Sequence, residues 1–186
     1  MKGHTFDQPK TTAVRPLSDK VRAAIFDVYG DVSGAVVLDV YAGSGAAGFE
    51  ALSRGASVVE AIESNASVVR VIESNCVALK LSWGYILHAL KAETWLGLPR
   101  NQQGDGETLG RYDLIIVDPP YAKLDREILS RLARFLVSGG TLVVSHSSKL
   151  EAPVLELAKL ARHKVYGDTA LSFYVAGPVI AGGSRT

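Results

Sequence analysis

The glycine-rich segment of residues 43–48 constrains the fold of this chain more than any other feature. Its letters, GSGAAG, follow the apolar run of residues 35–40 and open a helix-like stretch that continues to about Leu52. Glycines at such a place let the backbone turn tightly and approach a ligand at the start of a helix. The pattern therefore predicts a strand, a tight turn and a helix, the first unit of an α/β nucleotide-binding fold.

The rest of the chain alternates between short apolar runs and amphipathic stretches, which predicts a mostly parallel sheet covered by helices on both faces. Two closing extended segments, joined by Gly167-Asp168, indicate a hairpin and so an antiparallel strand at the end of the sheet. Further strands are expected at residues 58–62, 85–90, 114–117, 141–145, 164–166 and 170–175, and helices after Ser18 and Asn65 and over residues 124–135 and 150–160.

Composition limits the class of protein. A hydrophobic content of 47% supports one sizeable core. We expect a polar arm over residues 1–17, one domain over 18–175 and a flexible tail over 176–186. The first residues lack the apolar region of a signal peptide, and no apolar run approaches the ~20 residues that span a bilayer. These features predict a cytoplasmic protein that contacts no membrane.

Charge and metal-binding residue types exclude further possibilities. A net charge of +1 means that a nucleic-acid partner would need a local basic patch. The chain has 1 cysteine and 4 histidines, and these show no metal-ligand spacing, so we predict no metal. We expect a monomer.

Two cofactors compete for the glycine segment. Glu63 lies at the end of the next predicted strand, where a carboxylate accepts hydrogen bonds from ribose hydroxyls. This arrangement suits NAD and also the adenosyl half of S-adenosylmethionine. Asp39, at the end of the strand before Gly43, separates them, because a carboxylate there would repel a diphosphate. It suits instead the cationic ammonium and sulfonium of S-adenosylmethionine.

The segment Asp118-Pro119-Pro120-Tyr121 follows the apolar strand of residues 114–117. Ligands of open α/β sheets bind outside the carboxyl ends of the strands, so this segment should face the same crevice as the glycine turn. Asp118 and the Pro119 carbonyl can accept from the N–H groups of an aromatic amine and direct its lone pair toward a methyl donor. Tyr121 can stack on the base. The pattern predicts an amino-methyltransferase acting on a nucleic-acid base.

These motifs together resemble the RsmD family, the bacterial 16S ribosomal RNA guanine-N2 methyltransferases. The resemblance rests on LDVYAGSG at residues 38–45, Glu63-Ser64, the DPPY segment, RPLSDKVR at residues 15–22 and YGDTAL at residues 166–171. It implies a Rossmann-like class I methyltransferase fold with a seven-stranded sheet whose last strand is antiparallel. It also implies a guanine of 16S ribosomal RNA, in the small ribosomal subunit, as substrate.

The site residues follow from the motifs and this resemblance. Catalytic residues are Asp118, Pro119, Pro120 and Tyr121. S-adenosylmethionine would be bound by Asp39, Tyr41, Ala42, Gly43, Ser44, Gly45, Glu63, Ser64 and Ala92. RNA would be contacted by Lys10, Arg15, Lys20, Arg22 and Lys123.

The chain departs from the family in two places. It lacks the Gly- and Arg-rich first segment that contacts RNA in other members. Near the third strand, where many methyltransferases place an Asp that meets the adenine amine, it reads Leu90-Lys91-Ala92-Glu93. Three alternatives stay open: an amino-methyltransferase for DNA bases or another RNA, an NAD-dependent oxidoreductase, and a non-catalytic RNA-binding assembly factor.

Overall fold

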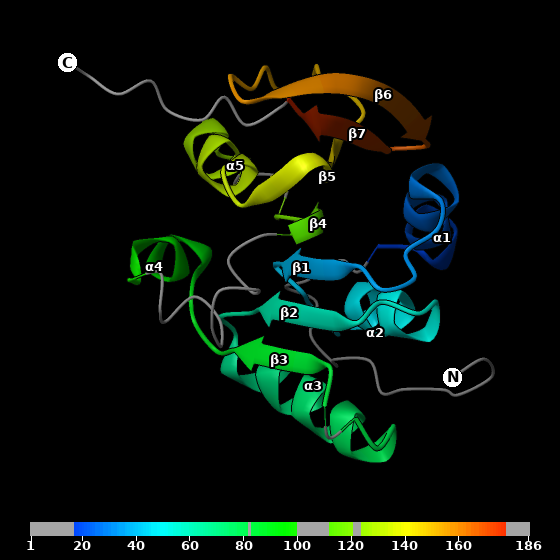
Figure 1. Cartoon of the computed structure of the whole chain (residues 1–186), viewed down its shortest axis with the longest axis vertical. Helices are drawn as coiled ribbons and strands as arrows, with labels where there is room; N and C mark the ends of the chain where they lie inside the picture. Colours follow the sequence, from blue (N-terminus) through cyan, green and yellow to red (C-terminus); the bar gives the residue numbers. More distant parts are fainter. Residues whose placement is uncertain (1–16, 82, 100–111, 121–123, 178–186) are drawn as a thin grey trace.

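The computed structural model describes residues 17–81, 83–99, 112–120 and 124–177 (Figure 1). The described helices are α1 (Asp19–Tyr29), α2 (Ala46–Ser53), α3 (Ala66–Ala78), α4 (Ala92–Gly97) and α5 (Arg126–Ala133). The described strands are β1 (Val36–Val40), β2 (Val58–Ile62), β3 (Tyr85–His88), β4 (Tyr112–Val117), β5 (Leu136–Ser147), β6 (Ala158–Tyr166) and β7 (Thr169–Ala176).

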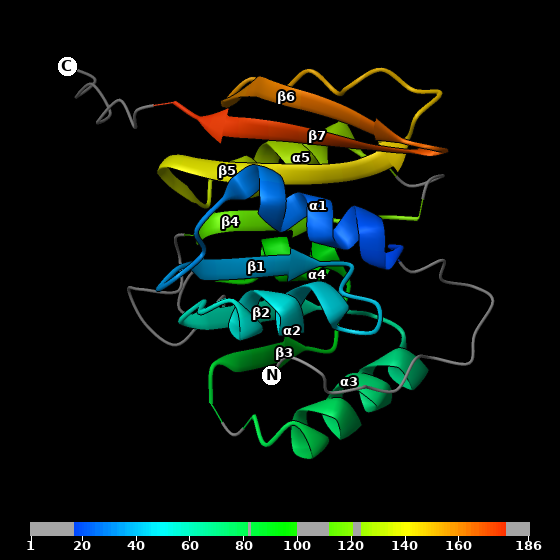
Figure 2. The same cartoon turned by 90° about the vertical axis from the view of Figure 1, so that its right-hand side faces the viewer.

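The described strands form one seven-stranded sheet in the order β3-β2-β1-β4-β5-β7-β6. β1 to β5 pair in parallel, whereas β7 is antiparallel to both of its neighbours, β5 and β6 (Figure 2). β1, β2 and β3 follow one another toward one edge of the sheet, and the chain then returns to place β4 on the other side of β1. β1 and β4 are therefore neighbours at the centre of the sheet. This topology confirms the predicted fold class, including the final antiparallel strand.

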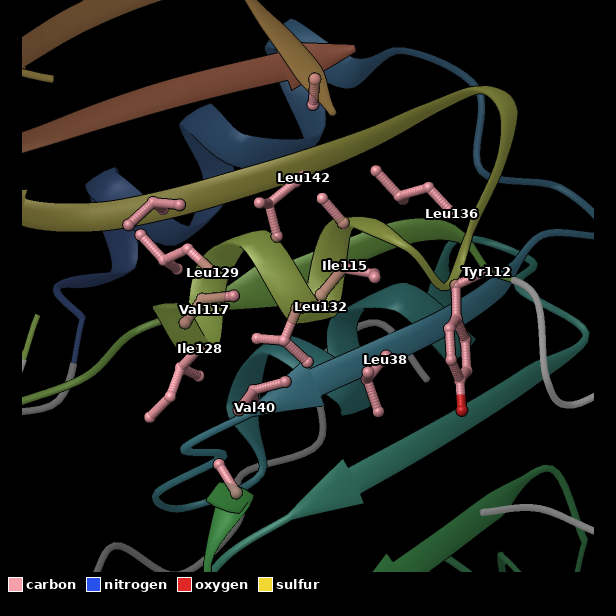
Figure 3. Close-up of a cluster of buried hydrophobic side chains, with 14 of the residues drawn as sticks. Leu38, Val40, Tyr112, Ile115, Val117, Ile128, Leu129, Leu132, Leu136 and Leu142 are labelled. Carbon is pink, nitrogen blue, oxygen red and sulfur yellow. The ribbon is translucent and has the colours of Figure 1, made fainter. Parts of the chain in front are cut away.

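Helices cover both faces of the sheet (Figure 1). α1 and α2 pack on one face, where Ile25 and Ala51 join the even-numbered side chains of β4, such as Ile116. α4 and α5 pack on the other face, where Trp95 and Leu132 belong to the larger core cluster. Figure 3 shows the part of this cluster around Leu132. We call the first face the α1 face and the second the α5 face. The central strands are buried on both sides, which explains their nearly continuous apolar runs.

Two helices begin as the sequence predicts. The Ser18 side chain accepts a hydrogen bond from the Val21 N–H at the start of α1. The Asn65 side chain accepts one from the Ser67 N–H at the start of α3. Such caps satisfy backbone donors that a helix leaves unpaired, and they fix where it begins.

Four features of the structure differ from the expected elements. Residues 150–160 do not form a helix: an irregular stretch leads into β6, which is longer than predicted. β6 lies at the sheet edge with little apolar burial, so it lacks the alternation that marks a strand. β5 begins at Leu136, before Gly139-Gly140, and the short helix α4 was not predicted. In the part of the chain described, no helix is long and apolar enough to cross a membrane.

Candidate active site

The turn between β1 and α2 is built around Asp39. Its carboxylate lies at the end of β1 and Oδ2 accepts the Gly48 N–H at 3.1 Å, so it holds the first turn of the helix. Gly43 and Gly45 take the left-handed conformation, with φ of 55° and 78°, which favours glycine. Gly45 is the N-cap of α2 and makes no side-chain cap bond. Backbone donors at this helix end are therefore available to an anion.

Glu63, just after β2, is held by two backbone groups. Its Oε2 accepts the Gly43 N–H at 3.0 Å and its Oε1 accepts the Asn65 N–H at 2.7 Å. A carboxylate offers about four lone-pair positions, so two remain for further donors. The glycine turn and Glu63 are thus parts of one rigid unit, and the carboxylate is oriented before any ligand binds.

The Asp118-Pro119-Pro120 turn lies against the same end of β1. The Asp118 N–H donates to the Val40 carbonyl at 3.3 Å, directly beside the start of the glycine turn. Two turns that are far apart in the sequence therefore meet at one rim of the sheet, as the sequence predicts. Pro119 is buried and Pro120 exposed.

Burial perturbs two carboxylates of this rim. Burial above all, with smaller contributions from the charges of Asp118 and Glu63 and against the Gly48 hydrogen bond, raises the pKa of Asp39 to about 7. Burial, partly offset by the nearby Ser145 hydroxyl, raises the pKa of Asp118 to about 6. Three carboxylates so close together disfavour a bound diphosphate and favour a cationic ligand.

Tyr85, on β3, belongs to the site but was not predicted for it. Its ring stacks on Phe49 with centroids 4.8 Å apart, beneath the glycine turn. A Cβ added to Gly45 would lie 2.9 Å from the Tyr85 hydroxyl, and one added to Gly48 would lie 2.8 Å from the Tyr85 ring. The buried hydroxyl has no hydrogen-bond partner among the residues that the structure describes. A tyrosine in a predicted strand gave no signal of this position, because the contact depends on tertiary packing.

The backbone after β3 joins the same rim. The His88 carbonyl accepts both the Glu63 N–H at 3.1 Å and the Leu90 N–H at 3.0 Å. Ala92, a predicted cofactor contact, follows as the buried first residue of α4. The side chain of His88 points to Glu60, with Nε2 and Oε1 2.6 Å apart.

The other predicted cofactor residues lie along the glycine turn. Ala42, Ser44 and Gly45 are buried, Tyr41 is half-buried and Ser64 is exposed. Burial, followed by the charges of Glu93 and Asp125, raises the pKa of the Tyr41 hydroxyl to about 12.

The predicted RNA contacts are only partly covered. Tyr121, Lys123, Lys10 and Arg15 lie outside the described residues. Lys20 is exposed on α1. Arg22 forms ion pairs with Asp19 at 3.0 Å and with Glu50 at 2.9 Å, so its guanidinium group is already engaged.

The sequence pattern of the family described as "Conserved hypothetical protein 95", the RsmD family, matches residues 1–175. The chain belongs to this family. A Bacillus subtilis protein named "Putative rRNA methyltransferase YlbH" is 29% identical over 179 residues, which are 93% of this chain and 94% of the relative.

Solved structures agree with the RsmD family assignment. An Escherichia coli protein called "Putative methyltransferase yhhF" is 27% identical, with a TM-score of 0.76, and the similarity covers 91% of each chain. An RNA methyltransferase from Salinibacter ruber, solved in complex with S-adenosyl-L-homocysteine, has a TM-score of 0.66 at 12% identity. That likeness covers 92% of this chain and 100% of the other, and it shows a shared fold. This member of the RsmD family therefore has the fold of S-adenosylmethionine-dependent methyltransferases.

The described residues of the RsmD family site fit S-adenosylmethionine. The donors at the start of α2 suit a carboxylate, Asp39 suits an ammonium or sulfonium, and Glu63 has acceptor capacity for ribose hydroxyls. The buried Tyr85 hydroxyl beneath the turn is a further polar group without a partner among the described residues. Residues 89–92 after β3 read Ala-Leu-Lys-Ala, and the first carboxylate beyond them is that of Glu93, in the first turn of α4.

Proposed function

We propose that this chain transfers a methyl group from S-adenosylmethionine to the exocyclic N2 amine of a guanine in 16S ribosomal RNA of the small subunit. The observation that carries the proposal is the meeting of Asp39 and Asp118 at one rim, each beside a turn with its own chemistry. The glycine turn, with Asp39, suits a cationic methyl donor. The Asp118-Pro119-Pro120 turn presents hydrogen-bond acceptors for an amine. The names of the relatives, which include an rRNA and an RNA methyltransferase, support the choice of substrate.

The cofactor supplies an electrophilic methyl group on a positively charged sulfur. The chain holds the amine by accepting its N–H groups at the Asp118 carboxylate and the Pro119 carbonyl. Both acceptors lie in a short turn whose proline rings restrict the backbone, so the amine lone pair is directed at one place. Asp118 or water would accept the proton that the amine loses on taking the methyl group. Positioning of this kind supplies much of the rate acceleration.

The raised pKa of Asp118 also predicts how turnover depends on pH. Asp118 must be ionised to accept from the amine, and burial raises its pKa to about 6. Turnover should therefore fall as the pH drops below about 6 and be full above about 7.5, by the ordinary titration of one group.

Transfer of radiolabelled methyl groups tests the proposal. Small ribosomal subunits lacking the modification should accept label from S-adenosylmethionine, and nucleoside mass spectrometry should find it on N2 of a guanine. Asp118→Ala should abolish transfer while S-adenosylmethionine affinity, measured by calorimetry, changes little. Asp27→Asn, an exposed carboxylate on α1, is the matched control and should retain activity.

Other outcomes would assign the chain elsewhere. Methyl transfer to duplex DNA but not to ribosomal RNA would show that the substrate is DNA. Salt-dependent RNA binding without any transfer would indicate an assembly factor. Binding of NAD(H) and not of S-adenosylmethionine would overturn the cofactor assignment.

A further inference from the structure

β6 carries a row of cations on an exposed edge of the sheet. Lys159, Arg162 and Lys164 are all exposed, and no ion pair of theirs occurs among the described residues. No Asp or Glu lies within β6 itself. β6 thus brings three positive charges together on a chain whose net charge is only +1.

The pairing with β7 places these three cations on one face. Lys159 lies opposite Val175, Arg162 opposite Phe173 and Lys164 opposite Leu171. Opposed residues of an antiparallel pair point to the same side, and Phe173 and Leu171 pack on the α1 face. A register shift between Leu160 and Arg162 makes this possible, because without it Arg162 would point to the α5 face.

Asp118, directly after β4, lies on the same face by strand alternation. Lys164 is in register with Leu171, which is in register with Ser145 on β5, and Ser145 is beside Asp118. Three strand spacings separate Asp118 from Lys164, about 14 Å at ~4.8 Å each. Charges on an edge strand also discourage aggregation, but that role does not require them to share the face of the active site.

We propose that Lys159, Arg162 and Lys164, here called the β6 cationic face, bind phosphates of the RNA that flank the target nucleotide. This inference rests on the proposed function, because it takes the substrate to be RNA. The surface would supply part of the affinity for the RNA backbone. It carries no sequence information and so affects binding rather than base choice.

The test uses the triple variant Lys159→Gln, Arg162→Gln, Lys164→Gln and a labelled fragment of small-subunit ribosomal RNA. The plot of log Kd against log salt concentration should lose about 2 from its slope, at ~0.7 for each phosphate contact. KM should rise about tenfold with little change in kcat, while S-adenosylmethionine affinity and Tm stay the same. The control replaces two exposed cations at the other end of the sheet, Arg70→Gln and Lys80→Gln.

An unchanged salt slope in the triple variant, or an equal loss for each charge in the control, would overturn the proposed surface. The binding measurement requires no methyl transfer. Wild-type protein that binds RNA but does not methylate it would contradict the proposed function and leave the surface standing.

A second inference comes from Ser145, whose side chain is 2% exposed on β5. Its buried hydroxyl has no hydrogen-bond partner among the described residues. A buried hydroxyl left unpaired is unfavourable, so such groups are rare in folded proteins and call for a physical reason.

Ser145 and Asp118 occupy neighbouring positions on parallel strands. Val117 is opposite Val144, so the next pair in the same register is Asp118 and Ser145. Both lie two residues beyond side chains of the α1 face, Ile116 and Val143, and alternation turns them to that face as well. The influence of the hydroxyl on the Asp118 titration agrees with this proximity.

The backbone after Asp118 cannot hold its carboxylate in the usual way. An aspartate at a turn commonly accepts the N–H two residues further along. Here the next two residues are Pro119 and Pro120, and neither has an N–H. A hydrogen bond that orients the Asp118 carboxylate must therefore come from another segment, and the neighbouring strand β5 is placed to supply it.

We propose that Ser145 is a positioning residue whose hydroxyl donates to one oxygen of Asp118, so that the other oxygen faces the target amine. This too rests on the proposed function. Asp39 and Glu63 are the other ionisable groups that face this space, and their titration must be followed together with that of Asp118.

Carbon-13 NMR of the aspartate carboxyl groups tests the proposal without RNA. Ser145→Ala should move the Asp118 midpoint upward by about 1 pH unit, the lower limit for losing a hydrogen bond to a charged group. Ser145→Thr should restore it, and in the transfer assay kcat/KM should fall about tenfold in the alanine variant only. Ser172→Ala is the control, because Ser172 is equally buried on β7 but its hydroxyl lies 2.8 Å from the His146 ring.

An unchanged Asp118 midpoint in Ser145→Ala would overturn the inference. If the alanine variant does not fold, Ser145→Cys keeps the size and a weak donor, and an unchanged midpoint there would count equally against it. An inactive wild-type protein would refute the proposed function but leave the titration result valid.

Discussion

Asp39→Asn should make the free protein more stable while weakening its cofactor binding. The side chain is buried at the end of β1, and its carboxylate accepts the Gly48 N–H through Oδ2. Asparagine has the same shape and keeps a carbonyl oxygen for that hydrogen bond. The substitution therefore removes the charge and little else.

The size of the effect follows from the perturbed carboxyl. A pKa of about 7 in the folded state, against 3.8 normally, corresponds to about 4 kcal/mol of unfavourable free energy when Asp39 is charged. Because the folded protein holds this proton more tightly than the unfolded chain, the stability linked to Asp39 is present below pH ~4 and is lost as the pH rises through about 7. The advantage of the variant should therefore grow by about 3 kcal/mol between pH 4.5 and pH 8.

Denaturant unfolding of both proteins at the two pH values measures this difference. Asp118 titrates in the same window, but it is present in both proteins and largely cancels from the comparison. The exposed Asp27→Asn variant is the control and should show no pH-dependent gain. Calorimetry should find that the Asp39 variant binds S-adenosylmethionine at least tenfold more weakly, and that the wild type releases a proton on binding near pH 7.

Equal stabilities of the Asp39 variant and the wild type at pH 8 would refute the assignment of a buried, costly charge. Unchanged S-adenosylmethionine affinity would refute its role toward a cationic ligand. The two results are independent, so each part of the reasoning can fail alone.

Three further substitutions test the packing and the hydrogen bonds around the site. Gly48→Ala should destabilise the fold by about 1–3 kcal/mol, seen as a lower Tm, because its Cβ would lie 2.8 Å from two packed side chains; Gly97→Ala, with open space around it, should be nearly neutral. Glu63→Gln should weaken S-adenosylmethionine binding about 10- to 100-fold by calorimetry, since one acceptor oxygen is lost. Tyr112→Phe should cost about 1.5–3 kcal/mol in denaturant unfolding, because its hydroxyl donates to the buried Glu60 at 2.7 Å, yet leave cofactor affinity unchanged.

The parts of the fold that could be predicted are those governed by local pattern. β1, β2 and β4 are buried on both faces, so each is a short, nearly continuous apolar run that a sequence displays directly. The meeting of the glycine and proline turns also follows from sequence, because both come after parallel strands. Only residues 164–166 at the end of β6 could be predicted, since an edge strand exposed over most of its length has no such run.

The residues missed at the site depend on partners from other strands. Tyr85 reaches the glycine turn from β3, and Ser145 lies beside Asp118 only because β5 pairs with β4 in one particular register. A shift of one residue in that register would turn Ser145 to the other face of the sheet. Such relations arise between strands, so no motif within a single segment contains them.

The carboxylate rim explains why the site is built as it is. The charges of Asp118 and Glu63 repel that of the buried Asp39 in the free protein and contribute to its raised pKa. A cationic methyl donor relieves that repulsion, whereas the neutral sulfur left after methyl transfer no longer does so. The same arrangement would therefore favour binding of the reactant cofactor over retention of its product, and the strain within the rim would contribute to turnover. S-adenosylhomocysteine should accordingly bind more weakly than S-adenosylmethionine in the wild type, and Asp39→Asn should narrow the gap between them. A gap that is the same in both proteins would show that the charge of Asp39 does not distinguish the two states of the cofactor.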